Sequence, residues 1–212
     1  MSKGTVSTRQ PVREPRVRRG YFECRYGQLH VHNAIPPGGG FEEGTALLCV
    51  HGAGQTGRAF QRVLPVIGRD RSVYAPDLPG CGESDGPAAR ASASDVAAAL
   101  GDFLDTMRFR HIDVLGFHSG CLIAAELAIA RPQQVRRVVL MGIPSGAEVE
   151  RLRQIGQPLL VARARDETWE STGRAREFLP RARVLDLPQQ GAGVLETAAD
   201  VLVPPLREFL GH

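Results

Sequence analysis

Six short apolar runs recur along this chain of 212 residues, and no other feature limits the possible folds as strongly. Each run is four to seven residues long, which is typical of strands that a sheet buries on both faces. Segments with helical spacing separate the runs. Strands that alternate with helices in this way predict βαβ units, and therefore an α/β fold with a doubly wound, mainly parallel sheet and helices on both faces.

The predicted strands cover 45–50, 72–76, 112–115, 135–141, 158–162 and 183–187, and the predicted helices cover 57–67, 94–106, 121–130, 147–153, 171–178 and 197–209. Ser94 is the expected N-cap of the second helix. The third helix is apolar almost all round, so we expect it to be buried. Alternating apolar residues over 20–32 predict a β-hairpin that turns at Gly27 and Gln28.

Composition divides the chain into a leader and one domain. Residues 1–19 contain six basic residues, one acidic residue and no aromatic residue. We expect a disordered, solvated leader there, because such a segment cannot build a core. Contact with nucleic acid or anionic lipid is the alternative that its charge allows. Residues 20–212 are expected to form a single domain.

Several classes of protein are disfavoured. No apolar run approaches the roughly 18 residues of a membrane-spanning helix, and residues 1–20 lack the apolar segment of a secretory signal. The cysteines Cys24, Cys49, Cys81 and Cys121 are scattered, which argues against a zinc site and against a disulfide scaffold. No G-x-G-x-x-G loop follows the first strand, so the sequence does not support nucleotide binding. We therefore expect a cytoplasmic protein without a metal or cofactor, with a small-molecule substrate or ligand and without a membrane or nucleic-acid partner.

Ligands of open parallel sheets bind at the carboxyl ends of the strands, so the segments after the strands matter most. H-G-A-G (51–54) follows the first predicted strand, and D-L-P-G-C-G-E-S-D (77–85) follows the second. G-F-H-S-G (116–120) follows the third and leads into the buried helix. In this order the motifs resemble those of the α/β-hydrolase superfamily over about residues 20–211. The last motif also resembles a bacterial subgroup whose elbow reads G-[FY]-H-[ST]-G.

The resemblance implies the α/β-hydrolase fold and an oxyanion hole made of two backbone N–H groups. One group would belong to Ala53 or Gly54, and the other to Ser119, which follows the central residue of the elbow. Two fixed donors of this kind stabilise the negative oxygen of a tetrahedral intermediate. The loop over 77–85 is expected to have a structural role. Many members carry a lid of several dozen residues where this chain has only residues 142–157, so a cap domain is expected to be minimal or absent and the site open.

The elbow departs from the family pattern G-x-S-x-G. Aligning Gly116 and Gly120 with the two small positions puts His118 at the centre, where a serine is usual. The alternative register puts Ser119 at the centre and Phe117 where the tight turn needs a small residue. We favour His118, and we expect strain there, because a sharp elbow forces its central residue toward positive φ.

The remaining parts of the family's relay are only partly present. Asp166 follows the fifth predicted strand in the position of the family's acid, with Glu167 beside it, although a surface carboxylate or an N-cap is the alternative. The family's histidine should follow the last strand, where this chain has Ala192. The six histidines are at positions 30, 32, 51, 111, 118 and 212, and none lies in that loop. A serine hydroxyl without a base is a weak nucleophile at neutral pH, so ordinary serine-hydrolase chemistry is disfavoured.

Three functions fit these residues. The first is a hydrolase of a small ester or activated acyl compound, in which His118 acts as a general base on water or as the nucleophile, and Asp166 orients it. Ser119 contributes its backbone N–H there, or is itself the nucleophile in the alternative register. The second is a catalytically degenerate pseudoenzyme that serves as a binding module. The third is a non-hydrolytic lyase or cyclase. The fold alone cannot choose among them, and neither the substrate nor the oligomeric state follows from these residues.

Overall fold

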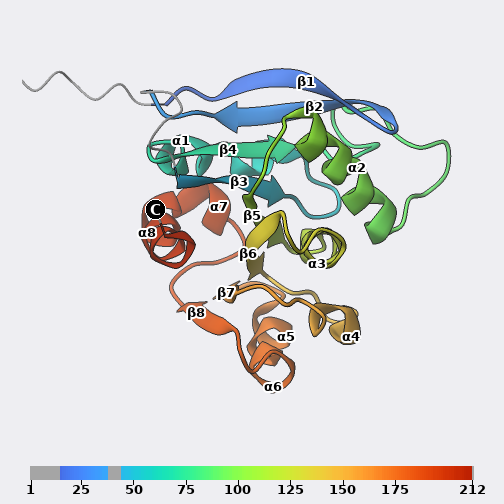
Figure 1. Ribbon diagram of the computed structural model, residues 1–212. Coiled ribbons are helices and arrows are strands. Elements are labelled where there is room, and N and C mark those ends of the chain that lie inside the picture. Colours follow the sequence, from blue (N-terminus) through green and yellow to red (C-terminus); the bar gives the residue numbers. More distant parts are fainter. Residues whose placement is uncertain (1–14, 38–43, 212) are drawn as a thin grey trace, which may run out of the picture.

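The computed structural model describes residues 15–37 and 44–211. Its eight strands are β1 Arg18–Cys24, β2 Gly27–Ala34, β3 Gly44–Val50, β4 Arg71–Pro76, β5 Ile112–Phe117, β6 Val135–Met141, β7 Leu159–Ala164 and β8 Arg183–Leu187. They form one sheet with the order β1-β2-β4-β3-β5-β6-β7-β8 (Figure 1). β3 to β8 are parallel, whereas β2 runs antiparallel to β1 and to β4. The predicted doubly wound, mainly parallel sheet is confirmed.

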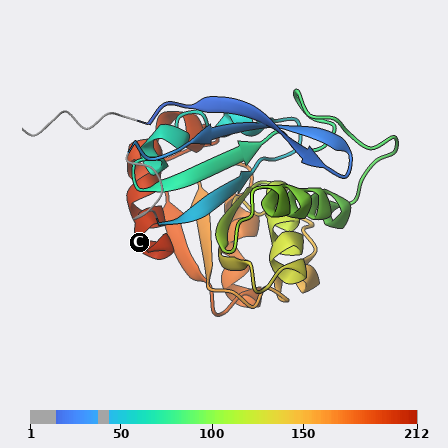
Figure 2. The same ribbon diagram turned by 45° about the horizontal axis from the view of Figure 1, so that its top comes forward.

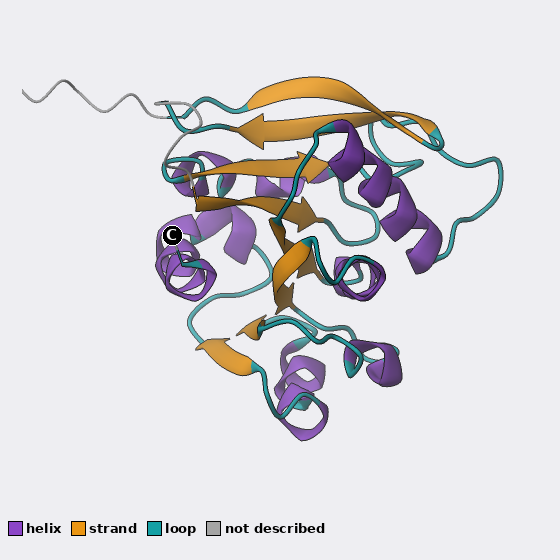
Figure 3. Cartoon of the chain, viewed as in Figure 1, coloured by secondary structure: helices purple, strands orange, loops and turns teal. Residues whose placement is uncertain are grey.

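Helices cover both faces of this sheet (Figures 2 and 3). They are the 3₁₀ helix η1 Gly57–Phe60, α1 Leu64–Ile67, α2 Ala93–Thr106, α3 Gly120–Ala130, α4 Val149–Leu152, α5 Trp169–Gly173, α6 Ala175–Phe178, α7 Val194–Thr197 and α8 Ala199–Leu210. One apolar cluster joins the sheet to α2, α3, α4 and α6. The other joins it to η1, α1, α7 and α8. All residues of β4 and β5 are buried between these two layers, which explains why apolar residues predominate in both strands.

Two local predictions are wrong by two residues. The hairpin turns at Arg25 and Tyr26, and Gly27 begins β2 with the positive φ of 108° that glycine tolerates after such a turn. The N-cap of α2 is Ser92 rather than Ser94, because the Ser92 hydroxyl accepts from the Asp95 N–H while the Asp95 carboxylate accepts from the Ser92 N–H. This reciprocal capping box outcompetes a cap inside the first turn.

Two predicted helices are broken in the structure. The segment 57–67 divides into η1 and α1, because Pro65 has no N–H to continue a helical ladder from the preceding turn. The segment 171–178 divides into α5 and α6 at Gly173, a residue that destabilises helix interiors. A short helix, α7, also begins within the stretch that was expected to be the loop after the last strand.

Strand β1 crosses the position, Gly20, at which the domain was expected to begin. β1 already includes Arg18 and Arg19, and the buried Pro15 precedes it. Residues 1–14 of the expected leader lie outside the described residues. Between β6 and β7, where a cap domain was expected to be minimal or absent, the four-residue α4 is the only helix, so no cap domain is formed there. Over residues 15–37 and 44–211, none of the helices has the length and apolar character needed to cross a bilayer.

Candidate active site

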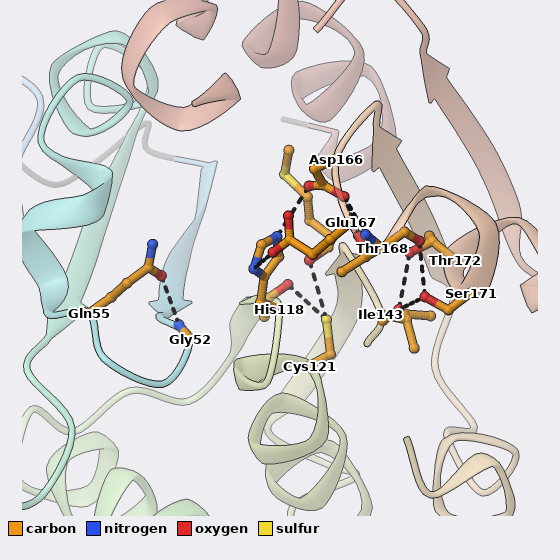
Figure 4. A network of polar contacts seen from close by, with 12 residues as sticks. Gly52, Gln55, His118, Cys121, Ile143, Asp166, Glu167, Thr168, Ser171 and Thr172 are labelled. Carbon is orange, nitrogen blue, oxygen red and sulfur yellow. Dashed lines mark hydrogen bonds and ion pairs between the residues drawn. The ribbon is translucent and has the colours of Figure 1, made fainter. Parts of the chain in front are cut away.

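The candidate active site lies where the segments after β3, β5, β6 and β7 meet (Figure 4). These four strands are neighbours in the sheet and are parallel, so their carboxyl ends share one edge. The segment after β3 contributes Gly52 and Gln55, the end of β5 leads into His118, and the segment after β7 contributes Asp166. Residues more than 100 positions apart in the sequence therefore lie together.

His118 is the central residue of the turn between β5 and α3. Its φ is +51°, whereas the φ of Ser119 is −63°. A Cβ on Gly116 would lie 2.6 Å from the backbone oxygen of Gly120, and a Cβ on Gly120 would lie 2.4 Å from the backbone oxygen of Val50. Glycine is therefore required two residues before and two residues after His118. The predicted strain is confirmed, and a left-handed backbone costs a residue other than glycine about 1–2 kcal/mol.

The His118 side chain reaches Asp166 directly. Its Nε2 lies 3.2 Å from Oδ2 of Asp166, whose side chain is 1% exposed, while the imidazole is 22% exposed. The other carboxylate oxygen accepts from the Thr168 N–H at 2.8 Å and from the Thr168 hydroxyl at 2.6 Å. Because an ionised carboxylate only accepts hydrogen bonds, Nε2 is the donor in this contact, and in a neutral ring the lone pair is then on Nδ1. Oε1 of the exposed Glu167 lies 3.6 Å from Nδ1.

Two neighbours hold the imidazole ring in place. The ring of Phe117 stacks on it with a centroid separation of 4.0 Å and an interplanar angle of 22°. On the segment after β6, Gly142 has a φ of +71°, and a Cβ there would lie 2.5 Å from Cδ2 of His118. Gly142 therefore lies where a side chain would collide with the ring.

The expected oxyanion donors are only partly free. The Ala53 N–H donates to the hydroxyl oxygen of Ser119 at 2.7 Å, so the two residues expected to form the hole contact each other through a side chain. Gly54 is exposed, with a φ of +74° and nothing within 4 Å of its Cβ position. The Gly52 N–H is turned to the Gln55 side chain, whose Oε1 accepts from it at 3.2 Å (Figure 4). A ligand oxygen that needs the Ala53 donor must therefore displace the Ser119 hydroxyl.

His51 links the loop after β3 to the loop after β4. The buried ring lies 2.8 Å from the Gly52 carbonyl oxygen through Nδ1 and accepts from the Leu78 N–H through Nε2 at 2.9 Å. Burial lowers the pKa of His51, which favours the neutral ring with one donor and one acceptor. This arrangement supports a structural role for the H-G turn and for the loop over 77–85.

The position of the family's base holds no titratable group. Ala192 is exposed in the segment between β8 and α7. The described histidines nearest in sequence, His111 and His118, precede β5 and follow it, so neither belongs to this segment. The imidazole of His118 is thus the basic group that the elbow itself supplies.

An open groove of about 810 Å³ adjoins the site between η1 and α7. Gln55 lines the groove and connects it to the elbow, because the Cβ position of Gly52 is 3.2 Å from Oε1 of Gln55 and 3.1 Å from Cβ of His118. Another cavity, of about 420 Å³, is lined by residues that precede β7 and β8, at the opposite edge of the sheet. Of these two spaces, only the groove is lined by a residue of the segment after β3, Gln55, which also contacts Gly52 of the site.

Three residues of this arrangement were not among the sequence candidates. Thr168 fixes the Asp166 carboxylate, Gly142 makes room for the imidazole, and Phe117 stacks on it. A glycine directly after a strand was a usable signal for Gly142, since it marks a close approach of the backbone. No pattern in the sequence indicates that Thr168 turns its hydroxyl toward the carboxylate two residues before it.

Comparisons with known proteins concern the fold and the family of the chain. The family described as the alpha/beta hydrolase fold matches residues 45–186. Among curated relatives, 2-hydroxymuconate semialdehyde hydrolase from Pseudomonas sp. (strain CF600) is 38% identical over 104 residues, which cover 47% of this chain and 36% of the relative. Lipase LipV from Mycobacterium tuberculosis is 29% identical over 206 residues, which cover 84% of this chain and 74% of the lipase. The match to the first relative thus spans about a third of that relative's length.

Solved structures share the fold at lower identity. A predicted CIB-like hydrolase from Thermoplasma acidophilum superposes with a TM-score of 0.79 and 15% identity, covering 92% of this chain and 98% of the other. At this identity the likeness concerns the fold alone. The family match covers most of the sheet and the elbow, and the chain therefore belongs to the alpha/beta hydrolase fold family.

Proposed function

We propose that this chain hydrolyses a small ester or acyl compound, with His118 in the place of the family's serine and with Asp166 orienting it. The observation that carries the proposal is the 3.2 Å separation between His118 Nε2 and Asp166 Oδ2. Membership of the family and the hydrolases among its relatives support a hydrolytic reaction. We assign the elbow to the G-[FY]-H-[ST]-G type, in an open site without a lid.

The imidazole can act in two ways, which use the same atoms. As a general base, Nδ1 takes a proton from water while the water oxygen attacks the acyl carbon, and the ring then returns that proton to the departing alkoxide. As a nucleophile, Nδ1 itself attacks, the alkoxide leaves, and water hydrolyses the acyl-imidazole. Each route consumes one water and yields an acid and an alcohol. In both, Asp166 accepts from Nε2–H and stabilises the positive charge that the ring gains.

The developing oxyanion would be held by the backbone N–H of Ser119 together with that of Ala53 or Gly54. In the structure the Ala53 N–H is already engaged by the Ser119 hydroxyl. Binding of a carbonyl oxygen to the Ala53 N–H then requires the Ser119 side chain to adopt another rotamer. Ser119 is exposed and no cap domain covers it, so its side chain has room to rotate. The small ligand would enter along the groove between η1 and α7.

The hydrogen bond from the Ala53 N–H to the Ser119 hydroxyl also supports a second candidate function, that of a catalytically degenerate binding module. An oxyanion donor occupied by the protein's own hydroxyl, and an alanine in place of the base, are what loss of catalysis would produce. In that case the groove would still bind a small molecule, without converting it.

Turnover of activated aryl acetates separates the two candidates. The wild-type chain, His118→Ala and the matched control His111→Ala should be purified in parallel, since His111 is exposed and lies before β5. The hydrolase proposal predicts equal turnover by wild type and His111→Ala, and background turnover by His118→Ala. If all three preparations show the same rate, the hydrolase proposal fails and the binding module is favoured.

A further inference from the structure

A second group of chemically able side chains lies outside the site described above. His30 and His32 belong to β2, and Asp77 directly follows β4. His30 Nδ1 lies 3.0 Å from Oδ2 of Asp77, and His32 Nε2 lies 3.8 Å from Oδ1 of the same carboxylate. One ligand atom from each of the three residues lies within 4.8 Å of the others. We propose that His30, His32 and Asp77 bind a divalent transition-metal ion, with Zn²⁺ as the best fit.

The register of the sheet builds this cluster. His30 and His32 are two positions apart on one strand, so their side chains leave the same face. β2 pairs with β4 in an antiparallel ladder in which Val31 lies opposite Pro76, and the Asp77 N–H donates to the His30 carbonyl at 2.8 Å. Asp77 therefore stands across from His30, and the backbone ladder holds all three side chains without support from a mobile loop.

The three side chains are sheltered from solvent, but an ion can still reach them. His30 and Asp77 are each 2% exposed, and the side chain of His32 is 12% exposed, which leaves a path for an ion. At 3.8 Å, the Nε2 of His32 is too far from Asp77 for a hydrogen bond.

The carboxylate is oriented by backbone groups, as the outer contacts of metal ligands usually are. Oδ1 of Asp77 accepts from the Gly57 N–H at 2.8 Å, and Oδ2 accepts from the Glu83 N–H at 3.0 Å. Oδ1 keeps a further acceptor position, and Oδ2 gains one when His30 Nδ1, 3.0 Å away, no longer donates to it, because a carboxylate offers about four acceptor positions. An ion bound here would tie β2 to η1 and to the loop after β4.

The donor set indicates the class of ion. Two imidazoles and one carboxylate suit Zn²⁺ and related first-row ions, and disfavour Ca²⁺ and Mg²⁺, which prefer oxygen ligands. With ligand bonds of about 2.0–2.2 Å, tetrahedral ligand atoms stand roughly 3.3 Å apart, which lies between the two separations in the structure. Binding at Nδ1 of His30 requires that its proton move to Nε2, so this step changes the tautomer and no net charge.

This site departs from the expectation, based on scattered cysteines, that the chain binds no metal. It uses no cysteine, and 47 positions separate His30 from Asp77. The sequence places the two histidines on one face of a strand, and the pairing of β2 with β4 adds the carboxylate.

Titration of the chelator-treated, untagged chain with Zn²⁺ tests the proposal. The decisive variant is His32→Gln, because His32 is the most exposed of the three residues and makes no hydrogen bond through its ring among the described residues. The controls His111→Gln and His118→Gln remove an exposed histidine and the imidazole of the elbow. Circular dichroism of each apo-protein confirms that the variants are folded.

We expect one equivalent of Zn²⁺ to bind to the wild type and to both controls, with an increase in Tm, and to bind about tenfold or more weakly to His32→Gln. Co²⁺ in place of Zn²⁺ should give the visible absorption of a nitrogen- and oxygen-ligated ion, and His32→Gln should lose it. The proposal is overturned if the wild type binds no stoichiometric ion. It is also overturned if His32→Gln binds as tightly as the wild type, or if His118→Gln abolishes binding. None of these readouts depends on hydrolysis.

Discussion

The Nε2 atom of His118 lies 3.2 Å from Oδ2 of Asp166, so a single side chain on the elbow reaches the acid after β7. In the relay that the family pattern implies, a serine and a separate histidine span this gap. Ala192 stands where that separate histidine would be. In the proposed function, the imidazole of His118 is consequently both the attacking group and the partner of the carboxylate.

The role of Gly142 in positioning the imidazole ring of His118 can be tested by substitution. A Cβ there would lie 2.5 Å from Cδ2 of His118, so Gly142→Ala should tilt or displace the ring and lower the ester turnover at least tenfold, a change of about 1.4 kcal/mol in the barrier. Stability should fall by about 1–2 kcal/mol, because alanine disfavours the φ of +71°.

Gly146→Ala is the matched control for Gly142→Ala. Gly146 has a φ of +78°, and nothing lies within 4 Å of its Cβ position. Its replacement imposes the same backbone strain without touching the ring, so denaturant unfolding should show a similar loss of stability with normal turnover. Equal turnover by both variants would show that Gly142 does not position His118.

Ser119→Ala tests whether the hydroxyl blocks an oxyanion donor. The variant releases the Ala53 N–H from its 2.7 Å contact while keeping the backbone N–H of residue 119. We expect ester turnover to rise about two- to tenfold, since a hydrogen bond contributes about 0.5–1.5 kcal/mol. A loss of turnover comparable to that of His118→Ala would contradict this and assign the chemistry to the Ser119 hydroxyl.

Asp113 makes stability depend on pH. It is fully buried on β5, both of its carboxylate oxygens lack a hydrogen bond among the described residues, and Nη1 of Arg71 lies 3.6 Å away. Burial raises its pKa to about 6 against an ordinary value of 3.8, although Arg137 and Arg71 oppose the shift. The folded state therefore binds the proton more tightly than the unfolded state, and stability falls as pH rises from about 4 through 6.

The loss is on the order of 3 kcal/mol, since each unit of pKa corresponds to about 1.4 kcal/mol. Asp113→Asn mimics the protonated carboxyl, so its stability relative to wild type should increase by that order between pH 4 and pH 7.5. Denaturant unfolding at the two pH values measures this difference, with the exposed Asp200→Asn as control. A difference that does not change with pH would show that Asp113 ionises normally in the fold.

Much of the fold could be predicted because burial on both faces leaves a continuous apolar run. β6 and β8 match their predicted ranges to the residue, and β4 begins one residue early. The ends of other elements depend on contacts that a local pattern does not contain. β5 continues past Gly116 because Phe117 still pairs with Met141 of the neighbouring strand. The helix over 57–67 breaks between Phe60 and Leu64, just before Pro65.

The candidate site could likewise be predicted from the sequence only in part. His118 and Asp166 could be located because the carboxyl ends of parallel strands share one edge, whatever the details of the loops. The Ala53–Ser119 contact joins residues 66 positions apart through one rotamer, which the sequence does not specify. The role of Gly142 likewise appears only once the imidazole is placed beside it.

Chemical rescue of His118→Gly by free imidazole tests the central claim most directly. Glycine accepts the φ of +51° without strain, so the variant keeps the elbow while removing the ring. We predict that the aryl ester turnover falls to background and that added imidazole restores it in a saturable manner, while a fluorophosphonate probe labels neither protein at Ser119. Full turnover by His118→Gly without imidazole, or robust labelling of Ser119 in the wild type, would contradict the account.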